Sequence, residues 1–282
     1  MNLRTGKNHA KTASLALAVA LGVLGFSQAG IAGDISSQDK QDIQDTIVRY
    51  KAAIGMNPKN AKNHVALGNA YLLDGNNEAA IASFREAGKL APDSTDSYIG
   101  LSRGLIRMGD EKGALKALED GAVRNPNDAD LHFKIGNLFM RGKNFDKAIA
   151  EYRTALKLKP KHSEAHRELG AALGTKGDLK AQVDEEKKCL EINGDDANAL
   201  YYLATAQIGL NNVPEALPLL EKCVKLDPKN ADAFRLLAAM KAASGDYKQA
   251  ITYAQKAVDI MPENKQYQQT LAKIKSKAGQ IK

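Results

Sequence analysis

The sequence has 282 residues, a formal net charge of +7, no Trp, 5% aromatic residues and eight prolines, a composition typical of a largely helical chain. A hydrophobic fraction of 44% beside 26% charged residues excludes disorder along the whole chain. Basic and acidic residues alternate without the clustered basic face that nucleic-acid binding requires, so we expect no nucleic-acid partner.

Residues 1–29 have the organisation of an export signal peptide. A positively charged start precedes an apolar run over 13–26, and small residues lead to a cleavage site. The basic residues of this start are Arg4, Lys7 and Lys11. We expect the mature protein to begin at Gly30, or at Gly33 if a second possible site is used, and to be periplasmic or secreted. The alternative is an uncleaved membrane anchor, which the short apolar run disfavours because a spanning helix needs about 20 strongly apolar residues.

The chain after the leader contains an internal repeat of 34 residues. Residues 30–41 are polar and predict a flexible linker, after which prolines recur at intervals of 34 residues. One interval is doubled, and Gly194 stands at the missing position, where a glycine also ends a helix. The prolines are Pro58, Pro92, Pro126, Pro160, Pro228 and Pro262. They define a half-repeat (42–60), six full repeats (61–94, 95–128, 129–162, 163–196, 197–230 and 231–264) and a C-terminal capping helix (265–282).

Each repeat predicts two closely packed antiparallel helices. The eighth repeat position is always small, which allows the two helix axes to approach within about 8–10 Å. The residues at this position are Gly68, Ser102, Gly136, Gly170, Ala204 and Ala238. Because one hairpin cannot bury its apolar face alone, neighbouring hairpins must stack into a solenoid.

The repeat length and residue types resemble the tetratricopeptide repeat over residues 42–264. The resemblance implies an all-α, right-handed superhelical solenoid of helical hairpins. In that family the first helix of each hairpin lines a concave groove, so the resemblance also implies a scaffold for a protein or peptide partner.

Candidate groove residues follow from the resemblance in repeats one to three. Two apolar rows flank amide and guanidinium groups, a surface suited to an extended peptide. The candidates are Val65, Asn69, Leu72, Ile99, Arg103, Ile106, Arg107, Phe133, Asn137, Met140 and Arg141. We expect Arg103 and Phe133 to contribute to binding and little to folding. The alternative is that some of these side chains pack against the neighbouring repeat.

No motif predicts catalysis, a cofactor or a metal site. The sequence has no glycine-rich phosphate loop, haem-attachment motif or nucleophile elbow, and the repeats leave no room for a catalytic domain. Cys189 and Cys223 share one repeat position, where stacking would separate them too far for a disulfide, so both are predicted to be buried thiols. Three histidines share another position and are predicted to be packing residues: His64, His132 and His166.

Repeat four departs from the pattern in its second helix. Gln182 and Glu186 stand where the repeat pattern expects a small residue and a large apolar one. Each polar group would cost about 1–3 kcal/mol if it were buried without a partner. We therefore expect residues 180–192 to open more readily than residues 147–157.

The sequence thus predicts an exported, non-catalytic adaptor that binds a protein or peptide of the cell envelope, in assembly, secretion or complex maturation. Contact with a membrane is expected only through a partner or an uncleaved leader. The alternative function is binding of an exported polysaccharide. That function is disfavoured because Phe133 and Tyr201 are among few aromatic residues at the groove positions.

Overall fold

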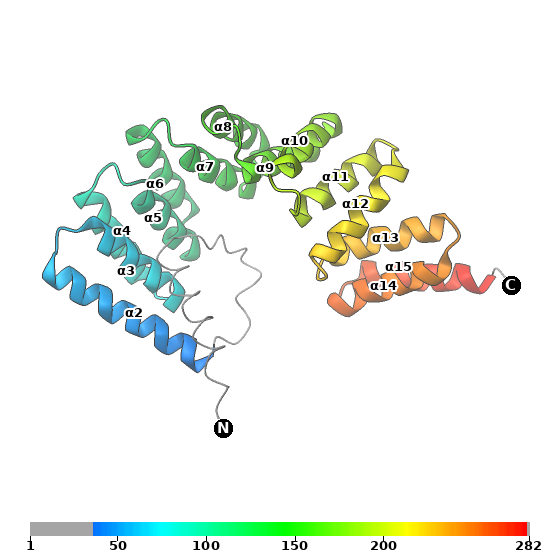
Figure 1. The fold of residues 1–282 in the computed structure, drawn as a ribbon, viewed down its shortest axis with the longest axis horizontal. Helices are drawn as coiled ribbons and strands as arrows, with labels where there is room; N and C mark the ends of the chain where they lie inside the picture. Colours follow the sequence, from blue (N-terminus) through cyan, green and yellow to red (C-terminus); the bar gives the residue numbers. More distant parts are fainter. Residues whose placement is uncertain (1–35, 281–282) are drawn as a thin grey trace, which may run out of the picture. The chain divides into compact units, whose positions relative to one another are not determined.

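The computed structural model describes residues 36–280, and every regular element within them is an α-helix. The helices belong to two compact units, and the boundary between the units falls after Leu138, inside α7 (Ala129–Arg141). Within each unit, consecutive helices lie side by side as stacked hairpins (Figure 1). The predicted all-α repeat fold is confirmed.

The first unit contains α2 and the hairpins of repeats one and two. Its complete helices are α2 (Ser37–Met56), α3 (Ala61–Asp74), α4 (Asn77–Leu90), α5 (Thr95–Arg107) and α6 (Glu111–Arg124). Each helix packs on the next as far as α6, and α3 also contacts α5 directly. The first helices of these two repeats are therefore neighbours on one side of the stack.

The second unit continues the same arrangement to the C-terminal end of the described residues. Its complete helices are α8 (Phe145–Leu158), α9 (Ser163–Thr175), α10 (Leu179–Ile192), α11 (Ala197–Gly209), α12 (Val213–Leu226), α13 (Ala231–Ala243), α14 (Tyr247–Ile260) and α15 (Lys265–Gln280). First helices again contact each other, α9 with α11 and α13 with α15. Tyr267 and Ile274 of α15 are buried at the end of the stack.

The helix α2 begins earlier than predicted. Residues 37–41 of the expected linker are helical, so the linker prediction is wrong for them. The reason is a capped N-terminus: the Ser36 hydroxyl accepts a hydrogen bond from the Asp39 backbone N–H at 3.1 Å and donates one to the Asp39 carboxylate at 2.7 Å. Residues 1–35, with the predicted leader and its cleavage site, lie outside the described residues.

The turn inside each hairpin requires one residue in the left-handed conformation. In four repeats this residue is a glycine with a φ value of 80–88°: Gly75, Gly109, Gly177 and Gly245. Glycine adopts this conformation at little cost because it has no Cβ. Lys143 and Asn211 occupy the same position in repeats three and five, with φ values of 57° and 66°. This conformation turns the chain so that the next backbone N–H bonds back into the first helix, a common helix ending.

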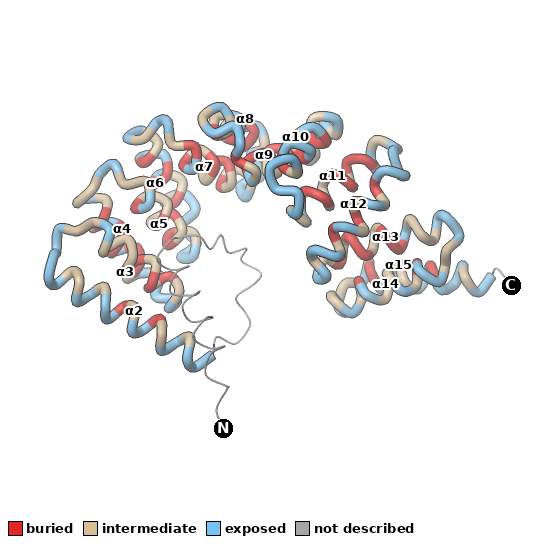
Figure 2. The backbone as a smooth tube through the Cα atoms, in the orientation of Figure 1, coloured by how far each residue is buried: buried red, intermediate tan, exposed pale blue. Residues whose placement is uncertain are grey.

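The core of each unit is a strip of buried residues along the facing sides of the helices (Figure 2). In the first unit, Phe84 is 1% exposed and lies across Gly68 and Gly100. A Cβ atom at Gly100 would lie 2.2 Å from the Phe84 ring, and one at Gly68 would lie 2.8 Å from it. The small residues thus let one aromatic ring of α4 pack against both α3 and α5.

The residue at the fourth repeat position ties each of the first four repeats to the loop before it. Its side chain donates a hydrogen bond to the carbonyl of the proline six residues earlier. The pairs are His64 with Pro58 (2.9 Å), Tyr98 with Pro92 (2.8 Å), His132 with Pro126 (3.3 Å) and His166 with Pro160 (2.9 Å). The histidines are therefore hydrogen-bonding residues of the inter-repeat junctions as well as packing residues.

Candidate functional site

The groove candidates of the first unit lie on α3, α5 and the first part of α7. Because α3 and α5 are in contact, the structure brings together seven of them, which we call the α3–α5 face. They are Val65, Asn69, Leu72, Ile99, Arg103, Ile106 and Arg107. Of the remaining four, Phe133 and Asn137 also belong to the first unit, whereas Met140 and Arg141 belong to the second.

Two arginines of α5 reach back to α3. Arg103 donates from Nη2 to Asn69 Oδ1 at 2.6 Å, and Arg107 donates from Nη1 to the Leu72 carbonyl. The Nε of Arg103 is buried and has no partner among the described residues. Burial lowers the pKa of Arg103, the Arg107 charge lowers it further, and Asp96 opposes both effects. Arg103 and Arg107 are two neighbouring cations, and Asp96 offsets their mutual repulsion only in part. Such a pair favours an oxygen acceptor from a binding partner.

The apolar candidates differ in how far they are accessible. Val65, Ile99 and Ile106 are half-buried, whereas Leu72 and Phe133 are each only 5% exposed. Leu72 packs in a core cluster with Phe84. The expectation that Phe133 contributes little to folding is therefore wrong, because a buried aromatic side chain contributes to core packing. Peptide binding by the α3–α5 face stays a prediction.

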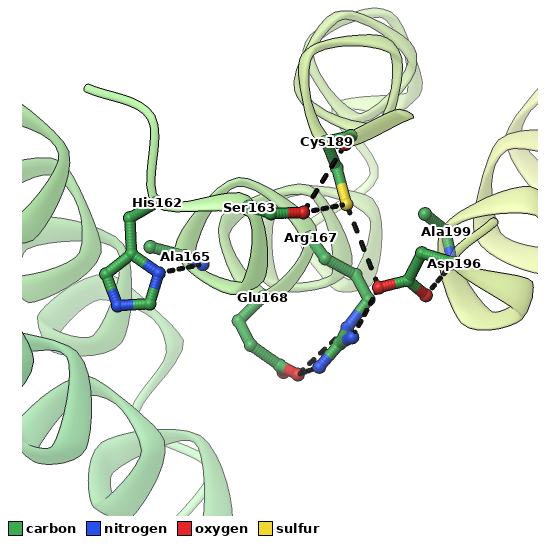
Figure 3. Close-up of polar contacts among 8 residues, drawn as sticks. All are labelled: His162, Ser163, Ala165, Arg167, Glu168, Cys189, Asp196 and Ala199. Carbon is green, nitrogen blue, oxygen red and sulfur yellow. Dashed lines mark hydrogen bonds and ion pairs between the residues drawn. The ribbon is translucent and has the colours of Figure 1, made fainter. Parts of the chain in front are cut away.

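Repeat four places one charged residue, Arg167, where repeats one to three carry the apolar groove candidates Val65, Ile99 and Phe133. Arg167 of α9 donates from Nη1 to Asp196 at 2.7 Å and from Nη2 to Glu168 at 2.9 Å (Figure 3). Asp196 also accepts the backbone N–H of Ala199 at 3.0 Å and so caps α11. Burial alone would lower the pKa of Arg167, but the two carboxylates outweigh it and raise the pKa. Because Asp196 caps α11, the guanidinium links α9 to the N-terminus of α11.

Beneath this network lies a buried carboxyl group. Glu186 of α10 is 0% exposed, and neither of its oxygens has a hydrogen-bond partner among the described residues. Burial raises its pKa to about 9, with Arg167 opposing the shift and nearby carboxylates, chiefly Asp196, adding to it. Gln182, in contrast, donates to the Tyr202 carbonyl at 3.2 Å. Of the two polar residues that depart from the repeat pattern in α10, Gln182 has a hydrogen-bond partner and Glu186 has none among the described residues.

The described residues show neither a metal cluster nor a membrane span. No group of three or more His, Cys, Asp or Glu side chains within 36–280 is arranged to hold a metal ion. No helix in the same range is long and apolar enough to cross a membrane.

Both cysteines are free and 0% exposed, in agreement with the sequence prediction. Burial raises the pKa of both thiols to about 11, and at Cys189 a hydrogen bond with Ser163 partly offsets this effect. Since the thiolate is the reactive form, we expect native protein at neutral pH to react with a maleimide far more slowly than denatured protein. Mass spectrometry before and after denaturation checks this, and fast labelling or an oxidised pair in the native protein would contradict it.

The stacked hairpins and their accessible first helices define the class of this protein as an α-helical repeat solenoid. Models described as tetratricopeptide repeat match residues 39–95, 71–138 and 201–265, and a further one described as TPR repeat matches 136–177. The chain belongs to the tetratricopeptide repeat family. No curated protein sequence is significantly similar to it.

Solved structures share this fold at low sequence identity. The Cut9–Hcn1 hetero-tetramer of the APC/C matches with a TM-score of 0.69 and 16% identity over 93% of this chain, which spans about half (52%) of that chain. Pseudomonas aeruginosa pilF matches with a TM-score of 0.69 and 19% identity, covering 76% of this chain and 97% of its own. YrrB, described as a TPR protein with an unusual peptide-binding site, matches with a TM-score of 0.52 and 21% identity, covering 65% and 95%.

Proposed function

We propose that this protein is a non-catalytic scaffold whose α3–α5 face binds an extended segment of a protein partner. The observation that carries the proposal is the hydrogen bond between Asn69 and Arg103. In the sequence of α5, Arg103 stands between Ile99 and Ile106, whose side chains are half-buried. An extended peptide has unpaired backbone donors and acceptors, and amide and guanidinium groups bond to them while the apolar groups receive alternate side chains. The peptide-binding site of YrrB, which shares this fold, supports this class of ligand.

Replacement of Arg103 by Ala tests this function. The variant is expected to weaken partner binding by about 1–2 kcal/mol, because arginines at the centre of an interface are often hot spots. The matched control is Lys116→Ala, which removes an exposed cation from α6. Thermal unfolding of both variants checks that the fold persists.

The partner itself is found by photo-crosslinking in cells. A photoreactive residue at Ile106 is expected to give discrete protein adducts, and the same residue at Lys116 is not. Equal adducts from both positions, or full binding by a folded Arg103→Ala variant, would place the binding surface elsewhere.

We further propose that the protein works outside the cytoplasm, in assembly, secretion or complex maturation at the cell envelope. The support is the leader-like organisation of residues 1–29. The exported protein is expected to begin at Gly30, or failing that at Gly33, which intact mass or N-terminal sequencing determines. Full-length protein in the membrane fraction would indicate the anchor instead.

A further inference from the structure

The first unit contains a cavity of about 400 Å³ between α4, α5 and α6. Phe84, Tyr98 and Leu101 supply apolar lining, and none of its lining residues belongs to the α3–α5 face. Tyr98 is held at the cavity by its hydrogen bond to the Pro92 carbonyl, which is also part of the lining. The cavity is thus separate from the α3–α5 face.

The cavity coincides with the absence of a side chain that the other repeats carry. Gly88 lines it, at the twenty-eighth repeat position. The equivalent residues are Ala122, Leu156, Leu190, Val224 and Val258. In the second unit the last three of these pack against a hydrophobic core cluster. Glycine at this position in repeat one therefore leaves open a space that larger residues occupy elsewhere.

A second departure from the repeat pattern lies at the same cavity. Arg124 lines it from the last residue of α6, the thirtieth repeat position. The other repeats have aliphatic residues there: Leu90, Leu158, Ile192, Leu226 and Ile260. Two independent exceptions, a missing apolar side chain and an added cation, thus meet at one cavity.

The cavity is electrostatically positive. Arg85 and Lys89 line it from α4, where they lie one turn apart, and Arg124 lines it from α6. None of its lining residues is acidic. Lys89 pairs with Glu86 at 3.0 Å, and the two side chains are 74% and 44% exposed. An exposed ion pair of this kind contributes little. Neither Arg85 nor Arg124 forms an ion pair with another described residue. The cations are therefore available to an anionic ligand.

We propose that this cavity binds an acidic peptide segment, with an aliphatic side chain in the space above Gly88 and carboxylates on both sides of it. The aliphatic side chain would take the place of the leucine or valine found in other repeats. Cations on two different helices suit a ligand with several carboxylates, whereas a fatty acid offers only one. This site goes beyond the proposed α3–α5 face and would give the scaffold a second contact.

The test uses a fluorescein-labelled peptide of sequence Asp-Glu-Leu-Leu-Asp-Glu and two variants that restore the repeat pattern, Gly88→Leu and Arg124→Leu. A Cβ at Gly88 would lie 3.4 Å from Ser97 Oγ, an ordinary contact, so the position accepts a side chain. Each variant is expected to weaken binding of the peptide by about tenfold in Kd, the effect of losing one hot-spot contact. Lys116→Leu is the matched control and is expected to bind normally. Gly88→Ala replaces Gly88→Leu if the larger side chain impairs folding.

Three results would overturn the proposal. The first is unchanged binding in both folded variants. The second is equal binding of a peptide with Ala in place of both Leu residues, which would indicate a charged surface only. The third is binding of dodecanoate without binding of the peptide. Arg103→Ala is expected to leave binding of this peptide unchanged. A failure of the cavity proposal can therefore be told apart from a failure of the proposal for the α3–α5 face.

Discussion

Replacing Glu186 by Leu is expected to raise the free energy of unfolding of the second unit by about 1–3 kcal/mol, the cost of a buried polar group without a partner. Leu occupies the same repeat position in two other repeats, as Leu118 and Leu220, both fully buried. Chemical denaturation of the wild type and the variant at one pH measures the difference.

The stability of the wild type is also expected to depend on pH through Glu186. Its pKa is about 9 in the folded protein and 4.5 when solvated, so the folded state binds the proton more tightly. The stabilisation is complete below about pH 4.5 and is lost as the pH rises towards 9, at up to about 1.4 kcal/mol per pH unit. Denaturation at pH 6 and pH 8 measures this loss.

Glu186→Gln separates the two effects. The amide cannot ionise, so this variant is expected to lose the pH dependence between pH 6 and 8. It retains a buried polar group and is expected to lack the gain given by Leu. Hydrogen exchange provides the local measurement, in which residues 180–192 of the wild type exchange faster than 147–157. The strongest protection at 180–192, or a wild type as stable at pH 8 as at pH 6, would show that Glu186 has a hydrogen-bond partner.

Replacing Arg167 by Leu is expected to destabilise the second unit by about 3–5 kcal/mol, because it leaves partly buried carboxylates without their cation. The side chains of Arg167 and Asp196 are 19% and 9% exposed, and their ion pair joins α9 to the N-cap of α11. Loss of the cation also removes the charge that favours ionised Glu186. Chemical denaturation measures the change.

The control for Arg167→Leu is the double variant with Asp196→Asn. Asn retains the oxygen that caps α11 but carries no charge, so the double variant is expected to recover about 1–3 kcal/mol of the loss. If both variants lose the same stability, the ion pair contributes nothing and the loss comes from side-chain packing.

Much of the fold could be predicted from the sequence because the repeat imposes its own register. First helices begin at the first repeat position throughout, as Ala61 and Thr95 do, and second helices begin sixteen residues later. The start of α2 was missed because a polar stretch resembles a linker until the cap at Ser36 is recognised. The left-handed conformation of Lys143 could not be predicted from its residue type, since a left-handed turn residue is usually a glycine.

The candidate site was less predictable because burial depends on contacts between repeats. The repeat position places Leu72 and Phe133 in the groove rows, yet both side chains are buried. Alignment of the repeats could have indicated the cavity, because Gly88 stands where the other repeats have larger residues. Its meaning depends on Arg124, one repeat later, and only the structure brings these two residues to one cavity.

The hydrogen bonds to the proline carbonyls have a consequence for how the sequence can vary. An imidazole Nε2–H and a phenol O–H both supply the donor for this carbonyl, as at His64 and Tyr98. Gln268 supplies it with an amide at Pro262, at 2.6 Å. His, Tyr and Gln therefore serve the same contact at these junctions, so the side chain can differ from one repeat to the next while the spacing of the repeats stays fixed.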